Sequence, residues 1–306
     1  MKSPLFTVLI PTYNRSILLH DAVKSVMMQT FKDFELILVD DYSTENIKEL
    51  ADSFNDKRIS YMLNTRSKGV AGARNAGIRR ARGQWVAFLD SDDIWLPRKL
   101  ELTQKKISTL DEQTGLIYTG YAEYDFIGNR KLSVHMPQKQ GWIKKDLLYK
   151  NYIGTFSTVV ARSDLLKAVD GCDERMNYSE DLDLYIRIAA LSKIDYLKEV
   201  LTLYRTANDD RLGYKYGEQM KGHKILWEKY GKIIDDDPKL KSRAASRVFL
   251  SAVALGDPEE LFKTLPLTLS CIFYDLPNFL QTFKITMSIV YDKIFCHSSM
   301  NKAGLQ

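Results

Sequence analysis

Cysteine is scarce in this 306-residue sequence, which contains three of them, Cys172, Cys271 and Cys296. Their number is odd and their spacing matches no metal-binding pattern, so we expect neither a disulfide framework nor a cysteine metal site. A reducing, cytoplasmic compartment is the natural expectation. Long apolar runs are missing as well. The longest uncharged run near the C-terminus, residues 264–274, is too short for the about twenty residues that cross a bilayer.

Other absences narrow the class of protein further. The N-terminus enters a strand-like segment without the apolar core of a secretory signal, and the chain shows no repeat or low-complexity tract. The net charge of +5 permits attraction to phosphate or anionic lipid but does not indicate a nucleic-acid binder. The composition, 45% hydrophobic and 27% charged, is ordinary for a soluble globular protein. The length suits one large domain, or one domain with an appendage.

No glycine-rich phosphate loop follows the first predicted strand, residues 5–10. The segment that follows is Pro11-Thr-Tyr-Asn-Arg15 instead. This absence disfavours a Rossmann dehydrogenase. It also weighs against a sugar-nucleotidyltransferase, which shares a doubly wound sheet and metal chemistry and stays as the runner-up enzyme class.

Alternating strand and helix patterns fill the first ninety residues or so. Apolar runs predict strands at residues 5–10, 34–39, 59–63 and 86–89, the first of them stopped by Pro11. Helical periodicity predicts helices at 16–30 and 47–54, and a helix with a small-residue face at 69–81. This order predicts a doubly wound, mostly parallel sheet.

The pattern is less regular further along. We expect a helix at 97–110, a strand at 115–121 and then an irregular stretch of about thirty residues from Asp125. A strand at 154–162, with Ser163-Asp164 as a helix cap, precedes a helix at 182–191 and a strand-like segment at 194–203. From about Gly213 onward the sequence predicts helices alone.

Polar clusters follow the first, second and fourth predicted strands. They are Pro11–Arg15, Asp40-Asp41 and Asp90–Asp93. Carboxyl ends of parallel strands share one edge of a sheet, where open α/β sheets place their ligands. Asp90 and Asp92, two apart on an extended chain, can converge on one hard cation such as magnesium or manganese. Helix capping or an Asx turn is the alternative for a lone Asp-x-Asp, and Asp93 fits a cap of the helix near Pro97.

These clusters together suit a nucleotide-sugar. Tyr13 can stack on a base, and Asp40 or Asp41 can accept a hydrogen bond from a pyrimidine imide. Asp90 can hold a ribose hydroxyl and Asp92 the metal on the diphosphate. A further acidic cluster, Tyr178–Leu184, can supply a general base, or can cap a helix and complement its dipole.

Six segments in order resemble the family 2 glycosyltransferases with the GT-A fold. They are Val8–Asn14, Gln29–Phe31, Val39–Ser43, Ala73–Gly77, Phe88–Asp93 and Glu180-Asp181. The resemblance covers about residues 4–206. It implies a doubly wound mixed sheet, with nucleotide-sugar binding over about 1–110 and the acceptor side over about 111–206. Residues 207–306 then form a helical C-terminal region, either a packing element or a contact with a membrane surface or a partner.

The resemblance also implies a reaction and its residues. One sugar moves from a nucleotide-diphosphate donor to an acceptor hydroxyl, with inversion at the anomeric carbon. We expect the donor to be UDP-linked. Asp181 is the implied base, Asp92 with Asp90 the ligands of Mn²⁺ or Mg²⁺, and Glu180 and Arg205 are candidates for acceptor or phosphate contacts. The donor-binding set completes the site with Pro11, Tyr13, Asp40, Asp41, Lys68, Arg74, Asp90 and Ser91.

Two departures refine this expectation. The Gln-x-x-Arg-Trp motif of processive relatives is absent, since the only Trp after Asp181 is Trp227, so we expect one sugar per encounter. The Tyr204-Arg205 pair lacks a following His, and Arg205 can cover that role. The expected partners are a nucleotide-sugar and a glycan or lipid-linked acceptor, at the inner face of a membrane. A non-catalytic nucleotide-sugar-binding scaffold stays as the alternative.

Overall fold

The structure is a computed structural model that describes residues 3–206 and 216–291. The chain divides into two compact units, one of residues 1–175 and 180–209, the other of 176–179 and 210–306. The predicted start of the helical region near Gly213 and the third cysteine, Cys296, lie outside the described residues.

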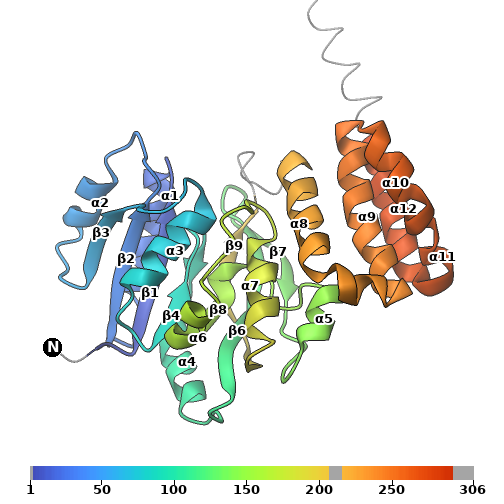
Figure 1. Ribbon diagram of the computed structural model, residues 1–306. Helices are drawn as coiled ribbons and strands as arrows, with labels where there is room; N and C mark the ends of the chain where they lie inside the picture. The colour runs from blue at the N-terminus through green and yellow to red at the C-terminus, as the bar shows by residue number, and fades with distance from the viewer. Residues whose placement is uncertain (1–2, 207–215, 292–306) are drawn as a thin grey trace, which may run out of the picture. The chain divides into compact units, whose positions relative to one another are not determined.

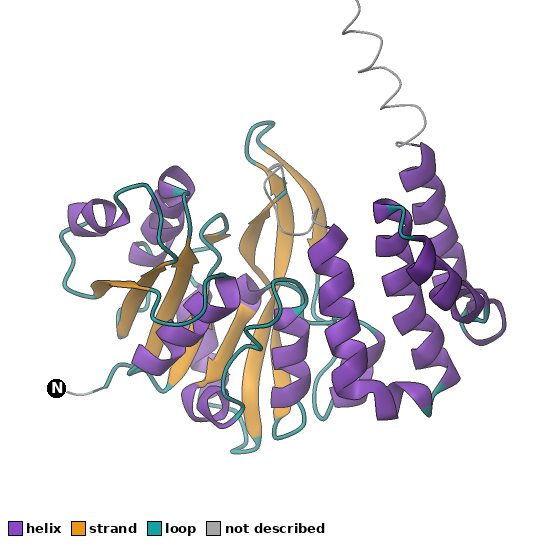
Figure 2. Cartoon of the chain, turned by 45° about the horizontal axis from the view of Figure 1, so that its top comes forward, coloured by secondary structure: helices purple, strands orange, loops and turns teal. Residues whose placement is uncertain are grey.

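The first unit is built on one nine-stranded sheet (Figures 1 and 2). Its strands are β1 (Phe6–Thr12), β2 (Phe34–Asp40), β3 (Ile59–Leu63), β4 (Trp85–Phe88), β5 (Ile94–Trp95), β6 (Thr114–Asp125), β7 (Arg130–His135), β8 (Val159–Arg162) and β9 (Lys193–Arg205). The order is β3-β2-β1-β4-β8-β6-β9-β5, with β7 paired to β6. Strands β3, β2, β1 and β4 are parallel, whereas β8 is antiparallel to both of its neighbours. The sheet is therefore mixed.

Helices cover both faces of this sheet (Figure 2). They are α1 (Ser16–Met27), α2 (Ile47–Ser53), α3 (Val70–Arg80), α4 (Lys99–Ile107), α5 (Lys144–Tyr149), α6 (Ser163–Ala168) and α7 (Glu180–Ile188), with a 3-10 turn η1 (Phe156–Thr158).

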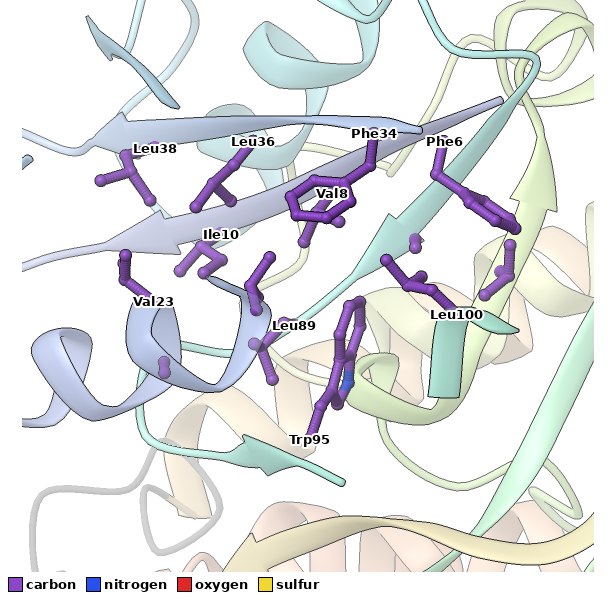
Figure 3. Packing of buried hydrophobic residues seen from close by; sticks show 14 of the residues in the cluster. Phe6, Val8, Ile10, Val23, Phe34, Leu36, Leu38, Leu89, Trp95 and Leu100 are labelled. Carbon is purple, nitrogen blue, oxygen red and sulfur yellow. The ribbon is translucent and has the colours of Figure 1, made fainter. Parts of the chain in front are cut away.

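The main core lies between one face of the parallel strands and helices α1, α2 and α4. Figure 3 shows Val8 and Ile10 of β1 packed with Val23 of α1, and Trp95 and Leu100 close by. Every second residue of β1 points to this face, because side chains alternate along a strand with a period of two residues. Burial of these apolar side chains is the main stabilising contribution to the fold.

The opposite face of the same strands carries α3. Leu9 points to this side, and its Cδ1 would lie 2.1 Å from a Cβ added at Gly77. The helix can approach the sheet closely only because Gly77 has no side chain. The small-residue face that the sequence predicts for residues 69–81 is thus the packing face of α3, where all residues from Ala71 to Ile78 are buried.

Several sequence predictions need correction. Strand β1 does not stop at Pro11 but continues to Thr12, because β4 pairs with β1 only as far as Leu9. Beyond that point Pro11 needs no amide hydrogen on the β4 side. The stretch after Asp125 is not irregular, since it contains β7 and α5. Ser163 is not a cap but the first residue of α6, and its hydroxyl donates to Gly83 O.

Other corrections concern β8 and short elements. Residues 154–162 do not form one strand: η1 precedes a four-residue β8. The two-residue β5 was not predicted, and several predicted helices are shorter at their C-terminal ends, as Ser16–Met27 is against 16–30. The predicted strand at 59–63 is confirmed to the residue.

Residues 216–291 of the second unit form helices joined by short turns. Its helices are α8 (Tyr216–Asp235), α9 (Pro238–Leu255), α10 (Pro258–Leu269), α11 (Cys271–Tyr274) and α12 (Leu276–Tyr291). Two of them begin with the same N-cap arrangement. Asp237 and Asp257 cap α9 and α10 with their carboxylates, each followed by a proline at the first helical position. No helix of the described residues is long and apolar enough to cross a membrane.

Candidate active site

The carboxyl ends of β1, β2 and β4 meet at one edge of the sheet, as the sequence predicts. Thr12 at the end of β1 pairs with Asp40 at the end of β2, and the Asp41 amide donates to Thr12 O across 2.9 Å. Pro11 is buried within β1. Tyr13 follows at the surface, 46% exposed, with the Lys68 ammonium 5.2 Å from its ring centroid. The structure therefore brings Tyr13 and Lys68 together beside the end of β2, where Asp40 and Asp41 lie.

Asp40 and Asp41 are both buried and both hydrogen-bonded. Asp40 accepts from the Tyr61 hydroxyl at 3.0 Å and from the Ser43 amide at 2.9 Å. Asp41 accepts from Asn64 Nδ2 at 2.7 Å and from the Gly69 amide at 2.8 Å, at the start of α3. Each carboxylate thus fixes the loops around this edge of the sheet.

The acidic cluster after β4 lies in a tight turn. Asp92 is buried and accepts from Arg15 Nη1 at 2.9 Å, while its backbone carbonyl accepts from Arg205 Nε at 2.9 Å. Ser91 is buried in the same turn. The guanidinium of Arg205 also lies 3.9 Å from the ring centroid of Phe126. Two arginines from distant segments therefore face the Asp92 turn.

Asp93 does not cap the next helix, and that prediction is wrong. Its carboxylate is fully buried, where Oδ2 accepts from Ser157 Oγ at 2.6 Å and Oδ1 from the Arg205 amide at 3.0 Å. Burial, and then the charges of Asp92 and Asp90, hold the pKa of Asp93 well above its ordinary value. Asp93 ties β4 to η1 and to the end of β9, which is a structural role.

Arg74 of α3 joins the acidic turn to the Glu180-Asp181 pair. Its Nη2 donates to Asp90 Oδ1 at 2.7 Å and its Nη1 to Glu180 Oε1 at 2.8 Å. The guanidinium is buried and lies 3.8 Å from the ring centroid of Phe156. Burial alone would lower the pKa of Arg74, but the Asp90 and Glu180 carboxylates more than offset it and raise that pKa. Asp90 Oδ2 accepts in addition from Thr155 Oγ1 at 3.2 Å.

Asp181 stands in the first turn of α7 beside this network. Its Oδ1 accepts from the Leu182 amide at 2.7 Å, and its Oδ2 from Asn151 Nδ2 at 3.2 Å. Burial, and then the Glu180 carboxylate, raises the pKa of Asp181 to about 7. The residue as a whole is only partly buried. A carboxylate with a pKa near neutrality can exchange a proton with a bound hydroxyl group.

The carboxylate oxygens at this edge fit a divalent cation whose coordination is completed by other ligands. Within residues 3–206 and 216–291, no three His, Cys, Asp or Glu side chains gather into a metal-binding group. Asp90 and Asp92 nevertheless offer carboxylate oxygens from one turn. Magnesium and manganese commonly use one or two carboxylates together with substrate phosphates and water. The residues present therefore fit such an ion as part of a ternary site.

Sequence reasoning missed the residues that the segment 151–158 supplies. Asn151, Thr155 and Ser157 contact Asp181, Asp90 and Asp93 respectively. Two of them, Thr155 and Ser157, lie within the segment 154–162 that the sequence predicts to be a strand. The only signal available was its polar content, Gly154-Thr-Phe-Ser-Thr158, which is unusual for a buried strand.

The mixed sheet and the acidic edge define a GT-A transferase, a class that uses nucleotide-activated sugars. The sequence matches "Glycosyl transferase family 2" over residues 7–165, and the chain belongs to this family. It is therefore a glycosyltransferase.

Two relatives have names that state an enzymatic activity. The Escherichia coli protein WfgD, a "UDP-Glc:alpha-D-GlcNAc-diphosphoundecaprenol beta-1,3-glucosyltransferase", is 34% identical over 53% of this chain and 62% of its own length. A Campylobacter jejuni "GalNAc(5)-diNAcBac-PP-undecaprenol beta-1,3-glucosyltransferase" is 32% identical over 68% of this chain and 66% of its own length. Both names describe hexosyl transfer to undecaprenol-linked glycans.

Solved structures show the same fold. Staphylococcus aureus TarS, in complex with UDP-GlcNAc, superposes with a TM-score of 0.65 at 18% identity, over 94% of this chain and 82% of that one. The mannosyltransferase PcManGT of Pyrobaculum calidifontis, with GDP-Man and Mn²⁺, gives a TM-score of 0.57 at 18% identity, over 96% and 88% of the two chains. At these identities the likeness concerns the fold.

Proposed function

We propose that this protein transfers one hexose from a UDP-sugar to a hydroxyl group of a lipid-linked glycan, with inversion and without processivity. A role in assembling a cell-envelope polysaccharide follows from such an acceptor. The observation that carries the proposal is the chain of contacts Asp90–Arg74–Glu180, which joins the carboxylates of the donor side to the segment of the proposed base. The curated relatives support the donor and acceptor classes.

The donor nucleotide binds along the edge formed by β1, β2 and β4. The Tyr13 ring lies at the surface, where a uracil can stack on it, and Lys68 adds a positive charge beside it. Asp40 or Asp41 accepts from the base, while Pro11 and Ser91 shape the floor of the site. Asp90 faces the ribose or the donor sugar and is held in orientation by Arg74 and Thr155.

Asp92 and Asp90 would hold a Mn²⁺ or Mg²⁺ ion, which when bound offsets the charge on the leaving diphosphate. Arg15 and Arg205 add positive charge around the same turn. In this arrangement Arg74 is a positioning residue, because its guanidinium is already engaged by two carboxylates. Glu180 acts through Arg74 in the same way.

Asp181 acts as the general base. The acceptor oxygen bonds to the anomeric carbon from the side opposite the diphosphate, while the bond from that carbon to the diphosphate oxygen breaks. The hydroxyl proton passes to the Asp181 carboxylate. Two hydrogen bonds, from Leu182 and Asn151, fix the orientation of this carboxylate before the acceptor arrives, and such positioning lowers the barrier.

We also propose that the C-terminal helices contact the membrane that holds the acceptor. Residues 261–291 include only three charged side chains, Lys263, Asp275 and Lys284. Large apolar side chains are exposed there, with Phe262 and Phe273 at 82% and 84%. On α12 the exposed residues Leu276, Leu280, Phe283 and Met287 recur at helical spacing on one face. Such a face suits the interfacial region of a bilayer, at the cytoplasmic side of the membrane.

A donor panel tests the proposed function. Purified protein with Mn²⁺ is incubated with UDP-Glc, UDP-GlcNAc, UDP-Gal or GDP-Man and a GlcNAc-diphosphate-alkyl acceptor, and nucleotide release and product mass are followed. We expect transfer from a UDP-hexose, a product of inverted anomeric configuration, and no transfer by Asp181→Asn although it still binds donor. If every pair of donor and acceptor shows donor binding but neither nucleotide release nor sugar transfer, the alternative of a non-catalytic scaffold is favoured.

A further inference from the structure

A cavity of about 150 Å³ lies in the first unit between β6, β7 and the segments 136–138 and 150–154. Its walls include Tyr118, Tyr121, His135, Lys150, Asn151 and Tyr152. Ligand sites for drug-sized molecules usually exceed about 300 Å³, so this cavity suits one sugar ring. None of the roles given to the donor site uses it.

The walls of this cavity are fixed by specific contacts. The Tyr118 hydroxyl donates to Lys139 O at 2.8 Å and accepts from the Lys139 amide at 3.1 Å, which holds the chain at 138–139. Asn151 Oδ1 accepts from the amides of Ile153 and Gly154. Gly154 has φ +92°, and a Cβ there would lie 2.8 Å from Tyr121 Cε1. A glycine is required at this position for both reasons.

The cavity adjoins the proposed base. Asn151, which lines it, donates to Asp181 Oδ2 at 3.2 Å. Burial, and then the carboxylates of Glu123, Asp93 and Asp181, raises the pKa of Tyr121 to about 12, so its phenol lies within electrostatic reach of that base. The Tyr121 hydroxyl makes no hydrogen bond to any part of the chain that the structure describes. It is available to hydrogen-bond a sugar hydroxyl, whereas one face of the ring is already stacked on His135, with the ring centroids 4.4 Å apart.

Positive charge is frequent in the chain segment that supplies part of the cavity wall. Residues 126–154 contain six Lys or Arg and one Asp, a net charge of +5 that equals the charge of the whole chain. The ammonium groups of Lys139 and Lys150 each lie 5.6 Å from the ring centroid of Tyr152. Lys139 is paired with Asp146 at 2.8 Å, whereas Lys150 forms no ion pair with any described residue. An unpaired cation at the edge of a cavity can bind a phosphate group.

We propose that this cavity is the acceptor subsite, holding the sugar that bears the reacting hydroxyl against Tyr121, with the lipid-linked diphosphate at Lys150 and Lys139. This inference rests on the proposed function and deepens it. The sugar hydroxyl then faces Asp181 while the phosphates lie on the other side of the same ring. The substrate class that fits is a glycan whose reacting sugar is itself attached to diphosphate, rather than a long glycan that ends far from its lipid carrier.

Two matched acceptors test the subsite: GlcNAc-diphosphate-alkyl and the same GlcNAc-alkyl glycoside without phosphates. We expect the first to have the lower KM with the unaltered protein. Lys150→Glu should raise that KM about tenfold or more, since it loses one charge-assisted contact. It should leave unchanged the KM of the phosphate-free acceptor and of the donor. Lys131→Glu, in the same basic segment but outside the cavity lining, is the matched control and should change neither.

A second variant tests the sugar end of the subsite. Tyr121→Phe keeps the ring and removes the hydroxyl, so it should raise the KM of both acceptors alike and leave the donor KM unchanged. Equal KM values for the two acceptors, or equal effects of Lys150→Glu on both, would overturn the inference. Failure of the proposed function gives a different result, because the unaltered protein would then glycosylate neither acceptor.

Discussion

Arg74 Nη1 donates to Glu180 Oε1 across 2.8 Å, although 106 residues separate the two in the chain. The same guanidinium binds Asp90 and lies on the ring of Phe156. One buried cation thus fixes the distance between the acidic turn after β4 and the start of α7. The proposed donor and acceptor halves of the site depend on this one side chain for their alignment.

Arg74→Lys should therefore impair both transfer and stability. A lysine ammonium cannot span two carboxylates and stack on a ring as a planar guanidinium does. We expect the transfer rate to fall by about a hundredfold or more, through misplaced groups. Loss of the buried pairing should lower the free energy of unfolding by about 3 kcal/mol, measured in urea. Arg79→Lys, on the same helix but exposed, is the control and should behave like the unaltered protein. Normal transfer by Arg74→Lys would contradict the positioning role.

The sequence predicts the donor side of the site better than the acceptor side. Asp40, Asp41 and Asp92 stand directly after apolar strands, and parallel pairing is enough to bring such residues to one edge. Asn151 and Tyr121 carry no such local signal. Their place depends on β8 running antiparallel between β4 and β6, a long-range pairing that periodicity does not reveal. Asp93 was misassigned for the same reason, since its partner Ser157 lies 64 residues away.

Asp181→Asn should stabilise the protein in alkaline solution. The pKa of Asp181 is raised from 3.8 to about 7, so between these values the folded state binds more protons than the unfolded state. Stability from this group is therefore full at low pH and is lost as the pH rises through about 7. We expect Asp181→Asn to melt a few degrees higher than the unaltered protein at pH 8, with a smaller increase at pH 5 and little difference near about pH 4.

Asp164→Asn is a control of opposite sign for this measurement. The hydrogen bond from Arg162 comes first among the effects that lower the pKa of Asp164, so its charged form favours folding. Its replacement should leave the melting temperature at pH 8 unchanged or slightly lower, since the side chain is exposed. An Asp181→Asn protein that melts below the unaltered protein at pH 8 would show that the Asp181 charge is not destabilising.

The transfer reaction should show an acid limb set by Asp181. Only the deprotonated carboxylate can accept the acceptor's proton, and burial, followed by the Glu180 charge, raises its pKa to about 7. We expect kcat/KM to rise about tenfold per pH unit below this value and to level off above it. The measurement is a pH profile with saturating Mn²⁺. A flat profile between pH 5.5 and 8 would exclude Asp181 as the base.

Removal of the Asp92 carboxylate should uncouple donor binding from the metal. In the unaltered protein we expect UDP-sugar affinity, measured by calorimetry, to fall at least about tenfold when a chelator removes Mn²⁺. Asp92→Asn should bind the donor weakly whether or not Mn²⁺ is present. Asp52→Asn, an exposed carboxylate paired with Lys48, should keep the full response to the metal. If the chelator does not change the donor affinity of the unaltered protein, the proposal that Asp92 is a metal ligand is contradicted.

The proposed membrane contact depends on apolar side chains and not on charge. We therefore expect that salt does not abolish membrane binding. Phe262 and Phe273 are among the most exposed apolar residues of the described chain. Replacing both with Ser removes apolar surface while conserving net charge, and burial of a phenyl side chain contributes about 1.5–3 kcal/mol. We expect the unaltered protein to float with vesicles of phosphatidylglycerol and phosphatidylethanolamine even in about 0.5 M salt, where charge attraction is screened. The double variant should stay in the lower fractions.

Ile127→Ser, an equally exposed apolar side chain of the first unit, is the control and should float normally. Binding that disappears in salt but survives the double substitution would point to the basic segment 126–154 and not to these helices.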